Sequence, residues 1–397
     1  MESSEPNPTQ PVVERSAPTS LPTVVFAGGG TGGHLFPGIA VAEALKERGV
    51  AARCIFVGST RAVEQQIVAR HGFEHVALPV ESTAVLWRSP VRFANRMWKS
   101  ARVAREFLPE CKASIVVGLG GFASVPVVWA ARSSGIPMII LEQNAVPGRA
   151  TSWLAPRADL TCLGFAEAGR RLPDRCRQLV TGNPVRAEIS ALAASGASNE
   201  ANRTLLVLGG SQGSAALNEA FLACVENQPQ DFAGWKIVHQ TGRRDVEAVR
   251  LRYSSLGIAA CVAAFFDEMA LHYCDAGLAI ARAGALTLSE LACAGVPAVL
   301  VPYRKAVRNH QRLNAFSFEH VGAARVVRQS VEGAVTSANL QEQLRLLMTN
   351  DGLRGRMSRA IRSLARPNAA SLVAEQVNRL LCGERPAVST ESRPGDK

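Results

Sequence analysis

A glycine-rich segment near the start of the chain has the spacing of a loop that binds a phosphate or a sugar. Gly28, Gly30 and Gly33 fit the GxGxxG pattern, directly after an apolar run and before a helical one. Dinucleotide-binding loops also need an acidic residue at the end of the second strand. Here the predicted second strand, 53–57, is followed by no acid before Glu64. An enzyme that uses NAD is therefore disfavoured.

A second glycine-rich loop, GGSQGS over residues 209–214, follows another apolar run. Backbone N–H groups at the start of a helix near Ser214, with the hydroxyl of Ser211 beside them, would form a cradle for a phosphate. A tight strand-to-helix turn without a ligand explains the same residues. Two such loops in one chain favour the first interpretation, because two facing cradles would form a cleft.

The segment RAGALTLSE (282–290) combines a short turn with a carboxylate. Its Gly284-Ala285 turn would let a nucleotide lie against the backbone, and Glu290 can accept two hydrogen bonds from the hydroxyls of a ribose. A capping box, in which Thr287 begins a helix and Glu290 is its partner, accounts for the same spacing. The spacing alone leaves both interpretations open.

His34 and Glu142 are the candidates for a general base. An imidazole has an ordinary pKa of about 6.5, which suits proton transfer near neutral pH, and His34 lies in the first glycine loop. The alternative is that His34 only orients the loop or a bound acceptor. Glu142, two residues before Asn144, is the second candidate, and it can equally be a structural acid that accepts hydrogen bonds.

Short apolar runs alternate with segments of helical period along the chain. The predicted strands are 23–27, 53–57, 114–118, 138–141, 205–208, 236–240, 277–281 and 298–302. Continuous Val, Ile and Leu runs between helices are typical of parallel sheets that are covered on both faces. Because the alternation runs twice, and each run opens on a strand and a glycine loop, we predict an α/β protein. It would have two Rossmann-like, doubly wound domains that face a central cleft.

We place the boundary between these domains at the Gly182-Asn183-Pro184 break. The predicted parts are a disordered tail over 1–22, an N-terminal domain over 23–182, a C-terminal domain over 183–365, a helix over 366–382 that returns to the N-terminal domain, and a second disordered tail over 383–397. A chain of 397 residues is long enough to bury two cores, which agrees with this division.

The chain has 44 Lys and Arg against 33 Asp and Glu, so its formal net charge is +11. This surplus indicates an anionic partner, which could be nucleic acid, anionic lipid or a phosphorylated substrate. No nucleic-acid recognition motif accompanies the charge. The nine cysteines are scattered without a CxxC pair, which argues against a disulfide framework or a zinc site and for a reducing compartment.

Residues 86–107 hold the strongest local concentration of charge. Basic side chains recur there at spacings of three or four, on one face of a helix, with aromatic side chains between them. This pattern is typical of a helix that lies on an anionic membrane surface. An ordinary amphipathic helix with its Trp side chains packed inward has the same pattern. The predicted membrane patch consists of Trp87, Arg88, Arg92, Phe93, Arg96, Trp98 and Lys99.

The motifs of this chain, taken together and in order, are similar to those of one family. The chain resembles the MurG-type N-acetylglucosamine transferases (glycosyltransferase family 28) through GGGTGGHLFP (28–37), GLGGFASVP (118–126), EQNAVPG (142–148), TGNPVR (181–186), GGSQGS (209–214), RAGALTLSE (282–290) and HQRLNA (310–315). The resemblance implies a GT-B fold and an inverting transfer of GlcNAc from UDP-GlcNAc. The acceptor would be the muramyl C4 hydroxyl of lipid I, undecaprenyl-pyrophosphoryl-MurNAc-pentapeptide, and the product would be lipid II.

The resemblance also implies roles for individual residues. Glu290 would take the ribose hydroxyls, which favours the ligand-binding interpretation of the 282–290 segment. The acceptor and transfer face would contain Thr31, Gly32, Gly33, His34 and Asn144. The UDP-GlcNAc site would add Arg186, Ser211, Gln212 and Gly213 near the diphosphate, Phe266 at the uracil, Ala285, Leu286, Thr287, Leu288 and Ser289 along the nucleotide, and His310 and Gln311 at the sugar hydroxyls.

This chain departs from the family pattern in four places. Phe122 stands where a Tyr is usual, and Leu141 stands where a His is common. Arg308 and Asn309 replace a common acidic pair, which reverses the charge beside the donor sugar.

No metal and no cofactor are expected. Many sugar transferases hold a metal with Asp-x-Asp, and this sequence contains no such motif. The charge on the leaving UDP would then be stabilised by helix N-termini, loop amides and Arg186.

The expected partners are UDP-GlcNAc, lipid I, an anionic inner-leaflet membrane surface and other proteins of cell-wall synthesis, with no nucleic acid. We expect a peripheral membrane protein on the cytoplasmic face of the inner membrane. Two other functions fit the same features. One is a UDP-GlcNAc 2-epimerase, which shares the GT-B architecture but needs no membrane patch, and the other is a non-catalytic sugar-nucleotide-binding protein of the cell wall.

Overall fold

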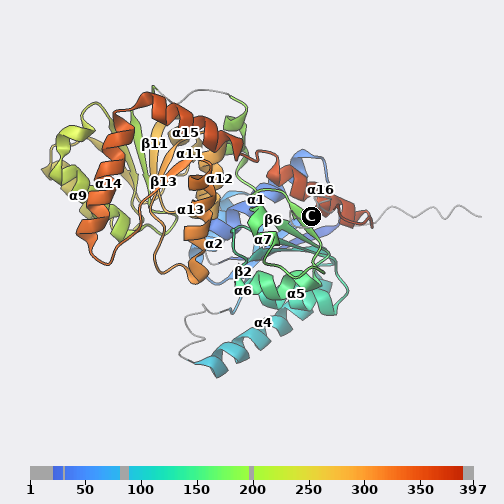
Figure 1. The fold of residues 1–397 in the computed structure, drawn as a ribbon. Helices are drawn as coiled ribbons and strands as arrows, with labels where there is room; N and C mark the ends of the chain where they lie inside the picture. The colour runs from blue at the N-terminus through green and yellow to red at the C-terminus, as the bar shows by residue number, and fades with distance from the viewer. Residues whose placement is uncertain (1–20, 30–31, 81–88, 196–200, 388–397) are drawn as a thin grey trace, which may run out of the picture.

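The structure, a computed structural model, describes residues 21–29, 32–80, 89–195 and 201–387, and it contains two parallel β-sheets (Figure 1). The N-terminal sheet has the strand order β3-β2-β1-β4-β5-β6-β7. Its strands are β1 (Thr23–Gly28), β2 (Arg53–Ser59), β3 (Glu74–Leu78), β4 (Ala113–Gly120), β5 (Met138–Glu142), β6 (Leu160–Leu163) and β7 (Gln178–Val180).

The C-terminal sheet repeats the same winding with the order β10-β9-β8-β11-β12-β13. Its strands are β8 (Thr204–Leu208), β9 (Lys236–Gln240), β10 (Ala260–Ala263), β11 (Ala276–Ala281), β12 (Ala298–Leu300) and β13 (Ala324–Val326). Every pairing in both sheets is parallel. The predicted α/β fold with two Rossmann-like domains is therefore confirmed.

Helices cover both faces of each sheet. Those of the first half are α1 (Gly32–Glu47), α2 (Ala62–Arg70), α4 (Pro90–Glu110), α5 (Ser124–Ser133), α6 (Arg149–Leu154), α7 (Ala166–Gly169) and α8 (Ala187–Ser190). Those of the second half are α9 (Ala215–Asn227), α10 (Val246–Ser255), α11 (Met269–Asp275), α12 (Ala285–Ala294), α13 (His310–His320), α14 (Gly333–Met348), α15 (Asp351–Ser363) and α16 (Ala369–Leu381). Four 3₁₀ turns are η1 (Ala155–Arg157), η2 (Ala191–Ala193), η3 (Pro229–Phe232) and η4 (Val307–Asn309).

The apolar strand sequences follow from this two-sided cover. In β1 every residue is buried, and successive side chains point to opposite faces of the sheet. Val24 and Phe26 pack into the core with α1, whereas Val25 and Ala27 pack into the core with α4 and α5. A strand with a helical layer on each side has no polar face, so it appears in the sequence as a continuous hydrophobic run.

Each glycine loop leaves its sheet at a topological switch point. The strand order reverses between β1 and β4 in one sheet and between β8 and β11 in the other. The first loop follows β1, and the second follows β8. Ligands of open α/β sheets bind at the carboxyl ends of the strands at this position, so the fold presents two candidate ligand loops.

The observed elements extend the predicted ones at several ends. The helical run that follows the first glycine loop begins at Gly32, so the loop runs directly into the first turn of α1. Strands β3, β6, β7, β10 and β13 were absent from the prediction. They lie at or beside the edges of the sheets and are at most five residues long. The predicted boundary at residue 182 stays a prediction; the structure has β7 before it and α8 after it, and α8 packs on α12.

Helix α16 lies against the N-terminal domain although it ends the described chain (Figure 1). Val373, Ala374 and Val377 are fully buried in the same core as Phe26 and Leu35. The last helix thus crosses from one domain to the other and covers α1. None of the helices in the described ranges is long and apolar enough to cross a bilayer.

The burial of α16 gives a testable expectation for stability. Val373→Ala removes two buried methyl groups from the N-terminal core and should lower the free energy of unfolding by about 1–3 kcal/mol. Leu372→Ala is the matched control, because Leu372 lies on the same helix with 39% of its surface exposed. Urea unfolding followed by circular dichroism measures both variants. Equal losses for the two variants would contradict this placement of α16.

Candidate active site

His34 lies in the first turn of α1 and faces Gly120 and Gly121 at the end of β4. A Cβ on Gly120 would be 3.2 Å from the imidazole Cδ2, and one on Gly121 would be 3.7 Å from its Cε1. Gly120 has a φ of +91°, a backbone conformation that is strained in any residue with a side chain. The glycines at the end of β4 therefore leave the space that the imidazole occupies.

The environment of His34 keeps its imidazole neutral. Its pKa is lowered to about 4, mainly because burial disfavours the charged ring and also because His310 lies near. The carboxylate of Glu64 opposes both effects. Since His310 begins α13 in the C-terminal domain, the structure brings two predicted site residues from opposite domains together. A neutral imidazole is the form that can accept a proton.

The segment before His310 has an unusual backbone and contacts the other domain. Arg308 and Asn309 both have positive φ angles, 54° and 55°. The guanidinium of Arg308 donates a hydrogen bond of 3.0 Å to the carbonyl of Pro147. The residue that departs from the family's acidic pattern therefore joins the two domains beside the candidate site.

Asn314 makes the most buried connection between the domains. Its side chain is fully buried, and its Oδ1 accepts a hydrogen bond of 2.9 Å from the backbone N–H of Ala145. Its Nδ2 donates to Oδ1 of Asn144 at 3.1 Å and to the carbonyl of Ala283 at 3.2 Å. One side chain thus fixes the 143–148 loop against the turn that precedes α12.

The second glycine loop lies against the first. A Cβ on Gly32 would be 3.5 Å from the Cβ of Ser211, so the two loops approach closely. Gly213 has a φ of +73°, and a Cβ there would be 2.2 Å from the carbonyl oxygen of Thr241. Only glycine fits this position. The predicted meeting of two loops is therefore observed, with Ser211 and Gln212 exposed at it.

Arg282 supports the second loop, and the sequence analysis gave it no role. Its guanidinium donates to Oγ of Ser214 from Nε at 2.9 Å and from Nη2 at 2.7 Å. Ser214 is the residue before α9, so a cation lies at the start of that helix. Burial lowers the pKa of Arg282 to about 10, which leaves it charged at neutral pH. A buried cation beside a helix N-terminus favours anion binding.

Gln240 is a second residue that the sequence analysis missed. Its Nε2 donates to the carbonyl of Gly210 at 3.3 Å, and its Oε1 accepts from the N–H of Phe266 at 3.1 Å. The side chain therefore fixes the glycine loop relative to the segment that carries Phe266. The position of Gln240 at the end of a predicted strand, beside the switch point, could have drawn attention to it.

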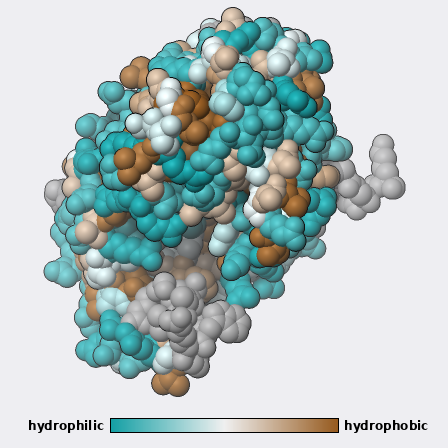
Figure 2. Space-filling view, turned by 90° about the vertical axis from the view of Figure 1, so that its left-hand side faces the viewer, coloured by the Kyte–Doolittle hydropathy of each residue, from teal (hydrophilic) through white to brown (hydrophobic). Residues whose placement is uncertain are grey.

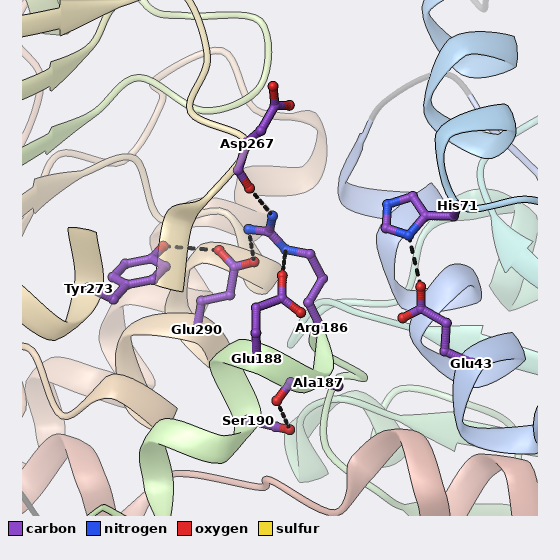
Figure 3. A network of polar contacts seen from close by, with 9 residues as sticks. All are labelled: Glu43, His71, Arg186, Ala187, Glu188, Ser190, Asp267, Tyr273 and Glu290. Carbon is purple, nitrogen blue, oxygen red and sulfur yellow. Dashed lines mark hydrogen bonds and ion pairs between the residues drawn. The ribbon is translucent and has the colours of Figure 1, made fainter. Parts of the chain in front are cut away.

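Glu290 belongs to a buried polar group that Figure 3 shows. One oxygen of its carboxylate contacts Nη2 of Arg186 at 3.4 Å, and the other accepts a hydrogen bond of 3.0 Å from the hydroxyl of Tyr273. Arg186 also donates to the carbonyl of Asp267 at 3.2 Å. Burial raises the pKa of Glu290, whereas Arg186 and Tyr273 lower it. Tyr273 had no role in the sequence analysis.

These contacts give Arg186 a position that differs from the predicted one. Its guanidinium lies over the ring of Phe36 at 5.1 Å and beside Glu290. Arg186 therefore holds the carboxylate that is expected at the ribose, and its contact with a diphosphate stays a prediction. Phe36 and Phe265 stack across the domains with centroids 6.5 Å apart.

Helix α12 begins without a capping box. Gly284 precedes its first residue, and no side chain caps the helix there. The carboxylate of Glu290 points to Arg186 and Tyr273 and not to the helix start. The alternative that Thr287 and Glu290 form a capping box is therefore wrong. The free N–H groups at this helix start remain available to a ligand.

Some predicted site residues have mainly structural contacts. Leu288 is completely buried in the C-terminal core, so the expectation that it lines the nucleotide is corrected. Ala285 is buried in the same core and Leu286 packs against it. The hydroxyl of Ser289 accepts from Asn183 at 3.1 Å.

Gln311 and Glu142 hold loops. Oε1 of Gln311 accepts from the N–H of Tyr303 at 2.8 Å. The carboxylate of Glu142 accepts from the N–H groups of Asn144 at 2.9 Å and Gly148 at 2.8 Å. These contacts give Glu142 the loop-holding role that was its alternative interpretation, while its role as a base stays a prediction.

The predicted membrane patch is partly described and partly corrected. Phe93 is buried, and its ring packs edge-on against Phe122 at 5.9 Å, so it cannot contact a membrane. The face of α4 that carries Phe93 packs against α5, which accounts for this burial. On the opposite face Trp98 is 60% exposed, beside the exposed Lys99. Arg92 is also exposed and Arg96 is half-buried. Trp87, Arg88 and Thr31 lie outside the described residues.

Two tryptophans extend this surface beyond the predicted patch. Trp129 on α5 and Trp153 on α6 are both exposed, with ring centroids 6.2 Å apart. Arg157 lies over the ring of Trp153 at 5.0 Å. Helix α5 packs beside α4 (Figure 1). The face of the molecule in Figure 2 is mainly hydrophilic, with hydrophobic residues in small separate groups.

Metal-ligating residues do not gather in the parts of the chain that the structure describes, where no group of three or more His, Cys, Asp and Glu side chains is placed to hold an ion.

Two family descriptions match the chain, one for each domain. The glycosyltransferase family 28 N-terminal domain matches residues 24–162, and the glycosyltransferase family 28 C-terminal domain matches residues 204–373. The first match includes β2 to β5 and the first glycine loop, and the second includes the whole C-terminal sheet with the second glycine loop.

Curated relatives match over nearly the full chain. A UDP-N-acetylglucosamine--N-acetylmuramyl-(pentapeptide) pyrophosphoryl-undecaprenol N-acetylglucosamine transferase of Nitratidesulfovibrio vulgaris is 39% identical over 91% of this chain and 97% of its own length. The protein of the same name from Pseudomonas paraeruginosa is 38% identical over 89% of this chain and 97% of its own length.

Solved structures show the same architecture. The crystal structure of MurG from Acinetobacter baumannii matches with a TM-score of 0.69 and 29% identity, over 90% of this chain and 99% of that one. A putative UDP-N-acetylglucosamine 2-epimerase from Listeria monocytogenes matches with a TM-score of 0.63 and 14% identity, over 94% and 100%. At that identity the second likeness shows the fold alone.

The hydrogen bonds of Asn314 lead to a prediction about the contact between the domains. Asn314→Ala leaves the buried N–H of Ala145 and the carbonyl of Ala283 without their partner, so the free energy of unfolding should fall by about 2–4 kcal/mol. Arg312→Ala on the exposed side of the same helix is the control and should change it by less than about 0.5 kcal/mol. Urea unfolding measures both. An Asn314→Ala variant as stable as the control would show that this connection is unimportant.

Proposed function

The chain belongs to glycosyltransferase family 28, and on that premise we propose that it transfers GlcNAc from UDP-GlcNAc to lipid I and so produces lipid II. The observation that carries the proposal is the meeting of the two switch-point loops, with Gly32 of one domain beside Ser211 of the other. A transferase must hold a donor and an acceptor against each other, and two ligand loops from two domains supply that arrangement. The relatives that cover nearly the whole chain carry this activity in their names.

The C-terminal domain would hold the donor. Glu290, fixed by Arg186 and Tyr273, would accept hydrogen bonds from the ribose hydroxyls. The N-terminus of α9 and the cation of Arg282 behind it would face the diphosphate. The free helix start of α12 adds a second set of N–H donors. Gln311 and His310, at the start of α13, would reach the sugar, and Phe266 would contact the uracil.

The chemistry would be a single displacement with inversion. The oxygen of the muramyl C4 hydroxyl bonds to the anomeric carbon of GlcNAc as the bond from that carbon to the phosphate oxygen of UDP breaks. The hydroxyl proton passes to the neutral imidazole of His34, and the electron pair of the broken bond leaves with UDP. Negative charge that develops on the diphosphate is stabilised by N–H groups and buried arginines.

The close approach of Gly32 and Ser211 has a consequence for binding. In this arrangement little space separates the two loops, so the donor would enter when the domains part and the site would form as they close. Closing of the domains would then restore the contacts made by Asn314, by Arg308 and by the stacked rings of Phe36 and Phe265.

The N-terminal domain would meet the membrane. The exposed residues of α4, with Trp129 and Trp153 beside them, would lie on an anionic lipid surface and bring the first glycine loop to a lipid-linked acceptor. We place the protein at the cytoplasmic face of the inner membrane, where other proteins of cell-wall synthesis are candidate partners.

A transfer assay tests the proposal. The full chain is incubated with radiolabelled UDP-GlcNAc and a soluble lipid I analogue, and the products are separated by chromatography. We expect label in a disaccharide product and none in free ManNAc. Formation of ManNAc without an acceptor would indicate an epimerase, and absence of both products with demonstrable UDP-GlcNAc binding would indicate a non-catalytic protein.

The role of His34 gives a prediction for kinetics. His34→Ala should lower kcat by about 10²–10⁴-fold, the usual contribution of a general base, and should leave UDP-GlcNAc binding within about threefold. The same transfer assay, with calorimetric titration of UDP-GlcNAc, measures both quantities. A variant that keeps more than about a tenth of the activity would exclude the base role.

The lowered pKa of His34 also predicts a pH dependence. Its neutral form, the active one, is lost only as pH falls through its folded pKa of about 4, well below the usual value of 6.5. The acid limb of kcat/KM should therefore lie below pH 5. Because a bound diphosphate favours the imidazolium, the acid limb of kcat should lie at a higher pH than that of kcat/KM. An acid limb of kcat/KM at about pH 6.5 would contradict the burial of His34.

The membrane surface predicts a charge-dependent association. Replacement of Arg92, Arg96 and Lys99 by Glu should reduce binding to vesicles of anionic lipid at least about tenfold, since each basic residue contributes about 1 kcal/mol near such a surface. The control is a variant in which Glu replaces Arg345, Arg356 and Arg359, because it makes the same change of net charge on the C-terminal domain. Cosedimentation with phosphatidylglycerol vesicles measures both. Equal losses in the two variants would mean that only net charge matters.

A further inference from the structure

A cavity of about 760 Å³ lies between the two domains, and the glycine loops do not line it. The N-terminal domain contributes the segment after β6, including α7, and the C-terminal domain contributes α12 and α13. The segment between α15 and α16 closes part of it through Leu364 and Arg366. Its volume is in the range of sites that bind small molecules, about 300–1,000 Å³.

Of the predicted donor-site residues, Ser289 alone lines this cavity. The next residue, Glu290, directs its carboxylate to Arg186 and Tyr273. Helix α13 reaches both places: His310 at its start lies near His34, whereas Leu313 and later residues of the helix line the cavity. An 11-residue helix is about 16 Å long, so one rigid element carries His310 at its start and lines the cavity from its second turn onward.

The walls of the cavity are largely apolar and come from both domains. Phe165 and Phe318 pack across the domains with ring centroids 6.4 Å apart. Phe316 is 58% exposed, and its ring stacks on His320 at 5.7 Å. Leu313 lines the same space. An exposed aromatic ring at the edge of an apolar cavity is a surface on which a flat apolar group can pack.

The charged groups at the cavity are unbalanced. Three arginines, Arg170, Arg171 and Arg366, line it together with one acid, Glu167. Glu167 accepts a hydrogen bond of 3.2 Å from the hydroxyl of Ser317. Arg171 and Arg366 donate to main-chain carbonyls, and within the described ranges the guanidinium of Arg170 has no hydrogen bond or ion pair. None of the three guanidiniums is neutralised by a carboxylate.

From this combination we propose that the cavity between the domains binds a small amphiphilic anion. The ligand has an apolar, preferably aromatic body that packs against Phe316 and Leu313, and a sulfonate, carboxylate or phosphate group that contacts Arg170 and Arg366. Because the ligand contacts both domains, its binding stabilises the arrangement in which they are closed. It also fixes α13, and through that helix it affects the position of His310.

A pair of dyes of similar shape tests the binding and its dependence on charge. 8-Anilinonaphthalene-1-sulfonate carries the anionic group, and N-phenyl-1-naphthylamine is its neutral counterpart. Fluorescence titration of the full chain should give a saturable site for the sulfonate. The double variant Arg170→Ala/Arg366→Ala should bind the sulfonate about tenfold more weakly, as expected for lost charge-assisted hydrogen bonds. Its affinity for the neutral dye should stay within about twofold of the wild-type value. Arg175→Ala/Arg345→Ala, two exposed arginines elsewhere, is the control and should change neither.

A second variant tests the place of binding by filling the cavity. Val180 lines the cavity from β7 and is partly exposed, so Val180→Trp puts a large side chain into the space without entering a core. It should abolish the saturable binding of both dyes, and circular dichroism establishes that the variant is folded. Unchanged sulfonate affinity in both Val180→Trp and Arg170→Ala/Arg366→Ala would overturn the proposal, because the dye would then bind elsewhere.

The proposed effect of the cavity ligand on His310 through α13 rests on the proposed function, and a separate measurement tests it. The sulfonate should change the KM for UDP-GlcNAc at least about twofold in the wild type and leave that of Val180→Trp unchanged. A chain without transferase activity would leave the dye titrations valid, so failure of the proposed function and failure of this site are distinguishable. Site-specific dye binding with an unchanged KM in the wild type would overturn the coupling alone.

Discussion

The arrangement of the candidate active site depends on a single buried side chain between the domains. Asn314 has no exposed surface, and its amide joins Asn144, Ala145 and Ala283 by three hydrogen bonds. A buried amide left without partners is costly, so the two domains are favoured in the one arrangement that satisfies it. This arrangement sets α13 against the N-terminal domain. The same arrangement includes the proximity of His310 to His34, the contact of Arg308 with Pro147 and the cavity along α13.

The donor side of the site relies on buried arginines and helix starts for positive charge. Arg282 lies behind the N-terminus of α9, and Arg186 holds Glu290 in place. Neither residue is exposed, so their positions are fixed by packing before a ligand arrives. A preorganised positive environment reduces the reorganisation that a leaving diphosphate would otherwise require. The second glycine loop is also fixed by the hydrogen bond from Gln240 to Gly210 and by the close packing of Gly213 on Gly242.

The sequence predicted the central part of each sheet because those strands are buried on both faces and appear as continuous apolar runs. It did not predict β3, β7 or β13, because edge strands are short and carry exposed residues such as Glu74 and Arg325. Within the site, the glycine loops were predicted from their spacing, whereas the ribose-binding role of Glu290 was favoured only by the family resemblance and stays a prediction. The role of Tyr273 could not be predicted, since it comes from a contact with a distant segment. Gln240 was marked only by its position at the end of a predicted strand, and its contacts are likewise with distant segments. Phe93 was assigned to the membrane patch because a helical pattern identifies an amphipathic face. The pattern does not show which of its residues are covered by other parts of the chain, as Phe93 is by Phe122.

The central claim is that the donor binds where the two switch-point loops meet. Hydrogen–deuterium exchange of the full chain with and without UDP-GlcNAc tests it most directly, because bound amides exchange more slowly. The account predicts protection in the peptides that cover 209–214 and 283–290 and, as the domains close, in the peptide that contains His34. Protection confined to the segments that line the cavity, 164–171 and 313–321, with the glycine loops unchanged, would contradict it.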